Sequence, residues 1–279
     1  MAKGTNNKNN IFLYQAESGK LSAADLAKAI KAIGIKTGDV IFVHSDVGAF
    51  GKIIVADREL FFGSIVDVLK KAVGKSGTII MPTFTYSIGA GKFFDVEKTP
   101  STVGALTEYF RNSARVRRTV EPIFSVAIWG KQQKALLKIG RHSLGKDSIF
   151  ERFHKMGGKI LLLGTRSCTF FHYIENIHGV PYRFEKPFII EIKNKSKIYK
   201  DEFIYYARRF DFKNNVSHFS IASKDLAKRN LFKKVKIGNS AAASVKSDVL
   251  FKEVYKKLDK DVNYYLNSGL TELEEKRLI

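Results

Sequence analysis

The stretch Gly157-Gly-Lys-Ile-Leu-Leu-Leu-Gly164-Thr-Arg-Ser-Cys-Thr-Phe-Phe-His172-Tyr-Ile-Glu175 decides the fold. Its first half is an apolar run closed by glycine, which is typical of a buried strand, and its second half, if helical, places His172 and Glu175 on one face. Comparable apolar runs predict strands at residues 40–43, 78–81 and 124–129. Caps and helical spacing predict helices at residues 22–33, 59–73, 99–110 and 150–156. Short strands that alternate with helices indicate an α/β fold with a central mixed sheet flanked by helices.

The final third of the chain has a different pattern. Its apolar runs predict a small antiparallel element from strands at residues 188–192, 197–199 and 203–206, and the remainder is expected to be mostly helical to Leu266. Because no internal repeat or Gly/Pro/Ser-rich linker divides the sequence, we expect a single domain over residues 16–279. The polar, Asn/Lys-rich start predicts a flexible tail over residues 1–15.

The 279-residue chain is strongly basic: 48 Lys and Arg against 27 Asp and Glu give a formal net charge of +21. Such an excess is typical of nucleic-acid binders, of proteins that attract small anionic ligands, or of a plain lysine-rich surface. The basic residues are scattered from Lys20 to Arg277, and no zinc-finger spacing or RNP-type aromatic motif accompanies them. We therefore expect no nucleic-acid partner, while anionic ligands and a solvated surface both stay open.

Membrane and secretory features are missing from the sequence. No apolar run approaches the roughly 20 residues of a membrane span, and the N-terminus lacks the apolar core of a signal peptide. The single cysteine, Cys168, excludes an internal disulfide and a multi-cysteine zinc site. We expect a cytoplasmic protein with no membrane partner.

The common cofactor and catalytic motifs also fail. Gly74-Lys-Ser76 resembles the end of a phosphate-binding loop, but Leu69 stands where the first glycine is required, and no GxGxxG, HExxH or GxSxG is present. His172, Glu175 and His178 spread around a helix instead of converging, so no metal is expected. Generic kinase, dehydrogenase and hydrolase functions are disfavoured.

His172 and Glu175 form the one constellation that suggests chemistry. In α/β sheets ligands bind beyond the carboxyl ends of strands, which is where this pair follows the strand at residues 159–163. A carboxylate beside an imidazole raises its basicity and fixes its orientation, which suits a general base. A structural His–Glu pair is the alternative that the two residues alone leave open.

The neighbouring sequence favours catalysis. Ordered blocks run through Gly38-Asp-Val-Ile-Phe-Val-His-Ser45, Gly77-Thr-Ile-Ile-Met-Pro-Thr-Phe-Thr85 and Thr99-Pro-Ser-Thr-Val-Gly-Ala-Leu106 to Thr169-x-x-His172-x-x-Glu175. In these blocks, and in Val235-Lys-Ile-Gly238-Asn-Ser-Ala241, the chain resembles the aminoglycoside 3-N-acetyltransferase family from about Leu21 to Leu266.

This resemblance implies direct transfer of an acetyl group from the co-substrate acetyl-CoA to a sugar amine. His172 would be the base that deprotonates the amine and Glu175 the carboxylate that holds it. An acyl intermediate on Cys168 is disfavoured, because a lone thiol in apolar surroundings is usually inert. The family's acetyl-CoA contacts correspond here to His44, Ser45, Asp46, Val47, Ser101, Thr102, Val103 and Ser125.

The acceptor is predicted from departures from the drug-modifying members. Glu121-Pro122 stands where those members usually carry His-Pro, and Ser45-Asp46 where they carry Ser-Ser. A +21 protein also repels polycationic aminoglycosides at long range and attracts phosphorylated ligands. We therefore expect a nucleotide-linked amino-deoxysugar of surface-polysaccharide biosynthesis as acceptor, bound by Thr83, Phe84, Tyr86, Glu121, Phe124, Tyr182 and Arg183.

Two other functions stay open. One is aminoglycoside 3-N-acetylation, as in antibiotic resistance, and the other is a non-catalytic basic binding protein that keeps the fold without the reaction. A homodimer is an assembly that the sequence leaves open.

Overall fold

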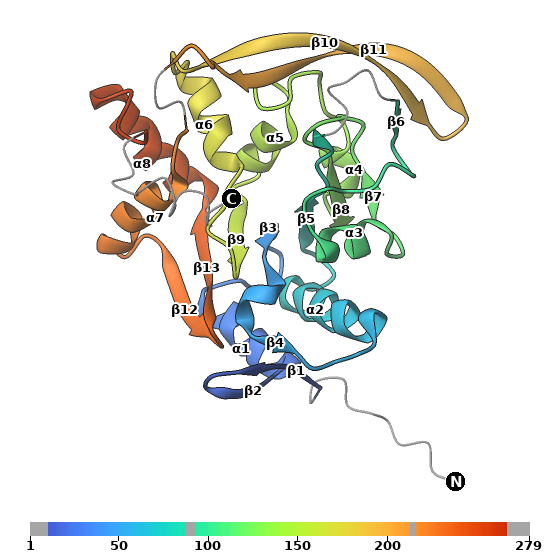
Figure 1. Ribbon diagram of the computed structural model, residues 1–279, viewed down its shortest axis with the longest axis vertical. Coiled ribbons are helices and arrows are strands. Elements are labelled where there is room, and N and C mark those ends of the chain that lie inside the picture. Colours follow the sequence, from blue (N-terminus) through green and yellow to red (C-terminus); the bar gives the residue numbers. More distant parts are fainter. Residues whose placement is uncertain (1–10, 87–92, 213–215, 267–279) are drawn as a thin grey trace.

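A seven-stranded mixed sheet forms the centre of the protein, for which a computed structural model describes residues 11–86, 93–212 and 216–266 (Figure 1). Its strand order is β12-β13-β9-β3-β5-β8-β7. Strands β9, β3 and β5 are mutually parallel, while β13, β8 and the edge strands run antiparallel to their neighbours. The bounds are β3 Val40–Ser45, β5 Thr78–Pro82, β7 Arg117–Arg118, β8 Val126–Gly130, β9 Lys159–Leu163, β12 Lys233–Ile237 and β13 Ser240–Lys246.

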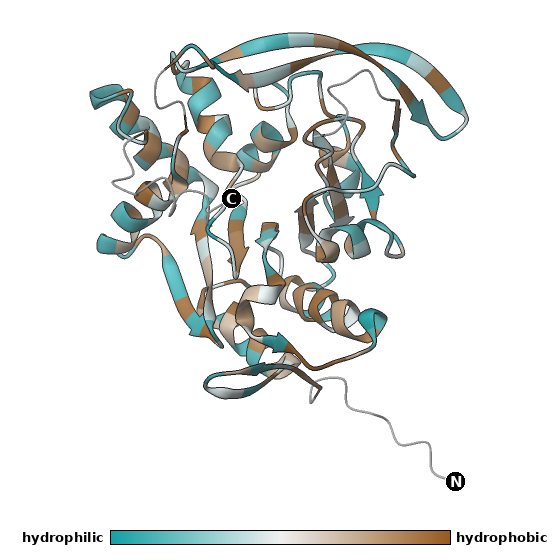
Figure 2. Cartoon of the chain, viewed as in Figure 1, coloured by the Kyte–Doolittle hydropathy of each residue, from teal (hydrophilic) through white to brown (hydrophobic). Residues whose placement is uncertain are grey.

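Alternate residues of a strand point to opposite sides of a sheet, and here the residues on both sides are apolar. Helices therefore cover both faces of this sheet. Ile41 and Val43 of β3 pack in a core with α1 and α2, whereas Phe42 between them packs in a second core with α5 and α6. Figure 2 shows the hydrophobic colour concentrated on β9, β5 and α2. The helices are α1 Ala23–Ala32, α2 Arg58–Val73, α3 Ala105–Arg111, α4 Gln133–Leu136, α5 Ile149–Lys155, α6 Phe170–His178, α7 Phe219–Lys228 and α8 Ser247–Lys260, with the 3-10 turn η2 at Val47–Phe50.

Two smaller sheets flank the central one. A long antiparallel hairpin extends along one edge of the molecule, with β6 paired to it (Figure 1). The other small sheet contains β1, β2 and β4. Their bounds are β1 Phe12–Ala16, β2 Gly19–Ser22, β4 Lys52–Ile53, β6 Phe94–Asp95, β10 Arg183–Asn194 and β11 Lys197–Arg208. The predicted α/β class, with a central mixed sheet and a small antiparallel element in the C-terminal third, is confirmed.

Several helix boundaries follow from single side chains. Ser22 and Asp25 form a reciprocal capping box at the start of α1, as their spacing predicts. The Asp57 carboxylate accepts the first backbone N–H groups of α2, and Gly74 ends that helix with a positive φ of 65°. Among the described residues, none of these helices is long and apolar enough to cross a membrane.

The structure differs from the sequence prediction in four places. The α3 helix begins at Ala105 and not at Thr99, because Thr102 is held outside the helix by its bonds to the Phe84 carbonyl. The three short strands predicted after residue 188 are two continuous strands of twelve residues each. Residues 233–246 form a β-hairpin where helix was expected, and residues 12–15 of the predicted tail lie in β1, while residues 1–10 lie outside the described part.

The ends of β3 and β9 meet at one edge of the sheet. Ser45 lies opposite Leu163, and the Asp46 N–H donates to the Leu163 carbonyl at 2.8 Å. Gly164 follows with a φ of 73°, and a Cβ there would lie 2.1 Å from the Asp46 carbonyl oxygen. Only glycine fits that position without displacing a loop. The two loops are therefore side by side, and α6 starts from the second of them.

Candidate active site

His172 and Glu175 lie together on α6, three residues apart on one helix face. The Nδ1 atom of His172 is 2.7 Å from Oε2 of Glu175. The Glu175 side chain has no exposed surface, whereas 29% of the His172 side chain is exposed. Nη2 of Arg183 also lies 3.1 Å from this Nδ1 atom. A carboxylate can only accept and a guanidinium can only donate, so Nδ1 cannot hydrogen-bond to both. The shorter contact, with Glu175, assigns the proton to Nδ1 and the free lone pair to Nε2, and it leaves Arg183 beside the ring as a charge. The pair predicted from the sequence thus has the geometry of an oriented base.

Three residues of the β10–β11 hairpin complete the surroundings of Glu175. The Tyr182 hydroxyl, just before β10, donates to Oε1 of Glu175 at 3.0 Å, and Nε of Arg183 lies 3.0 Å from Oε2. The Arg183 N–H is not aligned for a hydrogen bond, so this contact is an ion pair. The Tyr206 hydroxyl donates to the main-chain oxygen of Glu175 at 3.1 Å. Every oxygen of this buried residue therefore has a partner.

These contacts set the protonation of the pair. Burial opposes ionisation of Glu175, but the His172 and Arg183 contacts outweigh it and lower the pKa of the carboxyl. Burial, with the charge of Arg183, lowers the pKa of the His172 imidazole against the opposing influence of Glu175. At neutral pH the arrangement is an ionised carboxylate beside a neutral imidazole, which is the state that a general base needs.

The predicted acetyl-CoA residues of the first block lie at the end of β3, beside the loop that leads into α6. His44 is buried, its Nε2 atom has no hydrogen-bond partner in the described structure, and burial lowers its pKa to about 3. Ser45 and Val47 are half-buried, and the exposed Asp46 uses its carboxylate to cap the Gly48 N–H at 3.2 Å. The structure thus brings this group to the same sheet edge as His172.

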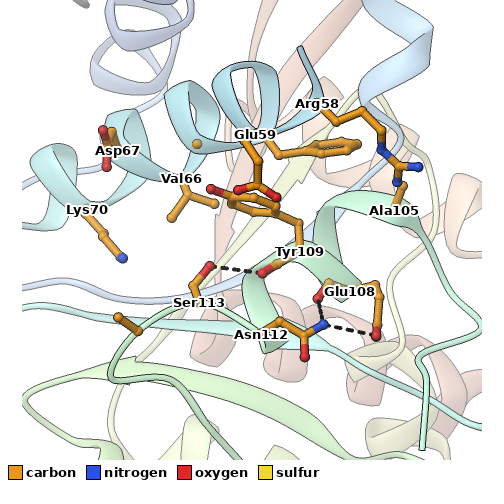
Figure 3. A pocket seen from close by; sticks show the side chains of 13 residues that line it. Arg58, Glu59, Val66, Asp67, Lys70, Ala105, Glu108, Tyr109, Asn112 and Ser113 are labelled. Carbon is orange, nitrogen blue, oxygen red and sulfur yellow. Dashed lines mark hydrogen bonds between the residues drawn. The ribbon is translucent and has the colours of Figure 1, made fainter. Parts of the chain in front are cut away.

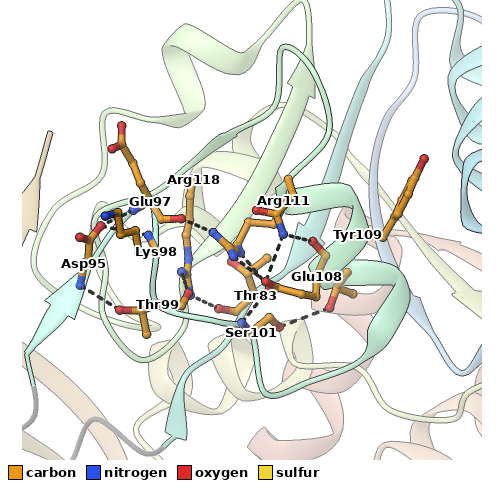
Figure 4. Close-up of polar contacts among 12 residues, drawn as sticks. Thr83, Asp95, Glu97, Lys98, Thr99, Ser101, Glu108, Tyr109, Arg111 and Arg118 are labelled. Atoms are coloured by element: carbon orange, nitrogen blue, oxygen red, sulfur yellow. Dashed lines mark hydrogen bonds and ion pairs between the residues drawn. The ribbon is translucent and has the colours of Figure 1, made fainter. Parts of the chain in front are cut away.

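The second predicted acetyl-CoA group is Ser101, Thr102 and Val103, and its backbone is hydrogen-bonded within the protein; Figure 4 shows the bond between Ser101 and Glu108. The Ser101 N–H donates to Glu108 at 2.9 Å, the Thr102 N–H to the Phe84 carbonyl at 2.9 Å, and the Val103 N–H to the Ser101 hydroxyl at 3.3 Å. Burial opposes ionisation of Glu108, but its bonds to Arg111 and Ser101 lower its pKa to about 2. The backbone N–H groups of all three residues are therefore already bonded within the protein, and contact of these residues with acetyl-CoA stays a prediction.

Thr83, Ser125 and Glu121 lie inside the protein. Ser125 donates to the Thr83 carbonyl at 2.8 Å and accepts Nε of Arg118 at 3.0 Å, and both Thr83 and Ser125 have no exposed surface. Glu121 accepts the Ser143 hydroxyl at 2.7 Å and the Phe124 N–H. These side chains hold the turn before β8, and direct contact with a ligand stays an untested prediction for them.

Three of the four predicted aromatic residues, Phe84, Tyr86 and Phe124, form one cluster, while Tyr182 lies against Glu175. The Phe124 ring stacks on Tyr205 at 5.8 Å and meets Phe84 edge-on at 4.9 Å. Phe84 and Phe124 are buried, while 57% of Tyr86 is exposed. Of the three aromatic residues predicted here to bind the acceptor, Tyr86 is the one that presents its ring to solvent.

Two other candidate features are a cavity whose lining does not include His172 and a cysteine that is buried and protonated. A cavity of about 630 Å³ lies between α2 and α3 and is lined by both signs of charge, among them Arg58, Glu59 and Lys70 (Figure 3). Cys168 is buried, and burial raises its pKa to about 12, which keeps the thiol protonated. Within the described ranges, no group of three His, Cys, Asp or Glu side chains is placed to hold a metal.

The sequence prediction missed four residues near the pair: Tyr206, Asn176, Glu185 and His142. Tyr206 supports Glu175, and Asn176, one turn after His172, donates to Glu185 at 3.3 Å. His142 also contacts Glu185, at 3.4 Å. The i, i+4 spacing of His172 and Asn176 could have identified the helix face, but no local pattern connects that face to the hairpin that begins at Arg183.

Comparison with known proteins agrees with the ordered sequence blocks. The sequence model of the aminoglycoside 3-N-acetyltransferase family matches residues 42–259. Aminoglycoside N(3)-acetyltransferase III of Acinetobacter baumannii is 28% identical over 179 residues, which cover 56% of this chain and 60% of the relative. Aminoglycoside N(3)-acetyltransferase IV of a Salmonella species is 25% identical over 88% of this chain and 90% of its own length. The solved structure of AAC-IIIb in a binary complex with CoASH shares the fold with a TM-score of 0.73 at 18% identity, over 86% of this chain and 97% of that one.

The predicted acceptor is therefore wrong. The matched family and the similar curated proteins are named for aminoglycosides and not for nucleotide-linked sugars, so the alternative function is the better supported one. The physical reason for the error is that net charge describes the whole surface, whereas an acceptor responds to the few groups around the base. The predicted role in surface-polysaccharide biosynthesis depended on that acceptor and is wrong for the same reason.

Glu121 generates a testable pH dependence. Burial raises its pKa from 4.5 to about 7, so the folded protein prefers the protonated carboxyl. The contribution of the Glu121 carboxyl to the free energy of unfolding is complete below about pH 4.5 and is lost as the pH rises through about 7. In Glu121→Gln the amide oxygen can accept the Phe124 N–H and the amide NH2 can donate to the Ser143 hydroxyl, so both contacts persist in neutral form and this loss is removed. We expect the variant to gain stability over the native protein between pH 5 and 8, by on the order of 3 kcal/mol at most.

Urea unfolding midpoints at pH 5, 6.5 and 8 measure this difference. Glu202→Gln, which changes an exposed carboxylate of β11, is the control and should show no such trend. A constant difference between Glu121→Gln and the native protein across this range would contradict the assignment.

Proposed function

Because the chain belongs to the aminoglycoside 3-N-acetyltransferase family, a family of acyltransferases, we propose that it transfers the acetyl group of acetyl-CoA to the 3-amino group of an aminoglycoside. The matched segment spans 60% of the Acinetobacter relative, and the match to the family over residues 42–259 supports a single acetyltransferase domain. The observation that carries the proposal is the oriented His172–Glu175 pair where β9 leads into α6.

His172 acts on the acceptor amine. At neutral pH the amine is an ammonium without a lone pair, so a base must take a proton before the nitrogen can attack a thioester. Nδ1 of His172 donates to Glu175, which leaves Nε2 to accept that proton. The amine nitrogen would then bond to the acetyl carbon of acetyl-CoA, the carbon–sulfur bond would break, and the CoA sulfur would leave as a thiol with the second proton of the nitrogen. Glu175 stays ionised and stabilises the imidazolium that forms.

Acetyl-CoA is proposed to lie along the loop that follows β3, with Ser45, Asp46 and Val47 as contacts. This loop adjoins the start of α6, because the Asp46 N–H is bonded to the Leu163 carbonyl. Attack on a thioester places a negative charge on its carbonyl oxygen, which needs hydrogen-bond donors. The Asp46 N–H cannot be one of them, because it already donates to the Leu163 carbonyl. Ser101, Thr102 and Val103 remain proposed contacts through their surfaces and not through free N–H groups.

A carboxylate beside the base supports a cationic acceptor in spite of the net charge of +21. Glu185 lies two residues after Arg183 on β10, so both side chains point to the same side of the strand. Arg183 contacts His172 and Glu185 contacts Asn176, one helical turn apart on α6. Glu185 is therefore about one turn from the base, and 47% of its side chain is exposed. It is proposed to bind an ammonium group of the acceptor that does not react.

The substitution Glu185→Gln tests this acceptor contact. Loss of one exposed charge-assisted bond should raise KM for an aminoglycoside by about tenfold, with KM for acetyl-CoA unchanged. Glu202→Gln on the neighbouring strand is the matched control and should leave both constants as they are. An unaltered KM for the aminoglycoside in Glu185→Gln would exclude this role.

The reaction itself is tested by release of the CoA thiol. We expect the purified protein to release thiol from acetyl-CoA with aminoglycosides and to yield a singly acetylated product. His172→Ala should lower kcat by about 10²-fold or more, the usual contribution of a general base, and should still bind acetyl-CoA. His178→Ala, on the same helix and paired with Asp259, is the control that keeps kcat.

Two outcomes would count against the function. Thiol release that no aminoglycoside stimulates would reject the acceptor class. A His172→Ala enzyme with kcat within about tenfold of the native value would reject the base, since general-base contributions are larger than that.

A further inference from the structure

Arg183 is a buried arginine in contact with both members of the His172–Glu175 pair. It is the first residue of β10, and 7% of its side chain is exposed. Its Nε lies 3.0 Å from Oε2 of Glu175 and its Nη2 lies 3.1 Å from Nδ1 of His172. With the Nδ1 proton directed at Glu175, the Arg183–His172 contact is one between a positive charge and the ring and not a hydrogen bond, and it opposes a positive charge on the imidazole. The guanidinium also lies over the Tyr206 ring, 5.7 Å from the ring centre. A residue expected from the sequence to bind the acceptor is instead packed behind the base.

The Arg183 guanidinium balances the negative charge of the buried Glu175 carboxylate. Glu175 has no exposed surface, and a buried carboxylate needs a cationic partner. If His172 were that partner, the pair would be stable as imidazolium and carboxylate, and the histidine could not accept a proton. Arginine stays charged at every working pH, so Arg183 can balance Glu175 while His172 remains neutral.

We propose that Arg183 is a positioning residue of the transfer: it holds the Glu175 carboxylate as the acceptor of the His172 Nδ1–H and keeps Nε2 unprotonated and free to take the proton of the amine. This inference rests on the proposed function, because it assigns a role within that reaction. In this role Arg183 acts through the two side chains it contacts, Glu175 and His172.

The charged groups that face His172 come from three elements. Glu175 is on the same helix, Arg183 is on β10, and Arg208 is on β11 opposite Arg183. Burial lowers the pKa of His172 most, the charges of Arg183 and Arg208 lower it further, and Glu175 raises it. Removal of Arg183 takes away a positive charge and leaves the negative charge of Glu175 beside the ring, so the pKa of His172 should rise.

The test compares Arg183→Gln, Arg183→Lys and a control, Arg141→Gln, which removes an exposed ion pair with Asp201 on the same hairpin. In Arg183→Gln the acidic limb of the pH profile of kcat/KM should move to higher pH, with kcat at pH 7 at least about tenfold lower, as expected for loss of most of the unprotonated base. KM for acetyl-CoA should not change. Arg183→Lys keeps the charge and should restore the position of the limb, and Arg141→Gln should match the native enzyme.

The ¹⁵N signals of His172 give a readout that does not depend on turnover. In the native protein they should show a neutral ring with the proton on Nδ1 at pH 7, and in Arg183→Gln an imidazolium. An unchanged limb together with unchanged ¹⁵N signals in Arg183→Gln would overturn the proposal. If that variant does not fold, the native signals decide, because a protonated His172 at pH 7 contradicts the role of Arg183 outright.

The two hypotheses fail in different ways. A native protein that releases no thiol with aminoglycosides disproves the function, while the ¹⁵N signals still report whether Arg183 keeps His172 neutral. Native turnover combined with wild-type behaviour of Arg183→Gln disproves the positioning role alone.

Discussion

The carboxylate of Glu175 is the group on which the site depends. It lies in the protein interior as an ion, and the energy lost by removing an ion from water has to be recovered from its partners. Those partners come from α6, from the residue before β10 and from β10 and β11, so a single carboxylate fixes a helix to a hairpin. The orientation of His172 follows from the same contacts, and its exposed side is left for the acceptor.

The central sheet sets the position of that carboxylate. Parallel β3 and β9 end together, and their loops approach so closely that Gly164 has no room for a side chain. The α6 helix therefore starts beside the β3 loop, where acetyl-CoA is proposed to lie. The hairpin contacts Glu175 and then runs beside α6, where Glu185 accepts a hydrogen bond from Asn176. An acidic side chain therefore lies near His172 in a protein that is basic as a whole.

Local patterns predicted the parts of this arrangement that are local. The strand at 159–163, the capping box of α1 and the i, i+3 pair on α6 depend on neighbours in the chain, and all are present. The environment of the pair could not be predicted in this way, because Tyr206 and Arg183 reach it through strand pairing. The sequence predicted only an acceptor contact for Arg183, because the packing of this side chain against Glu175 cannot be read from a local pattern. The net charge gave the wrong acceptor class because it does not show where single carboxylates such as Glu185 lie.

The claim at the centre of this account is that His172 and Glu175 act as one unit. The most direct measurement is the single-turnover rate of acetyl transfer in His172→Ala, in Glu175→Gln and in the double variant. Residues that act as a unit give strongly non-additive losses, so the double variant should be no slower than His172→Ala alone. Losses that multiply in the double variant would show that the two side chains contribute independently and would contradict the account.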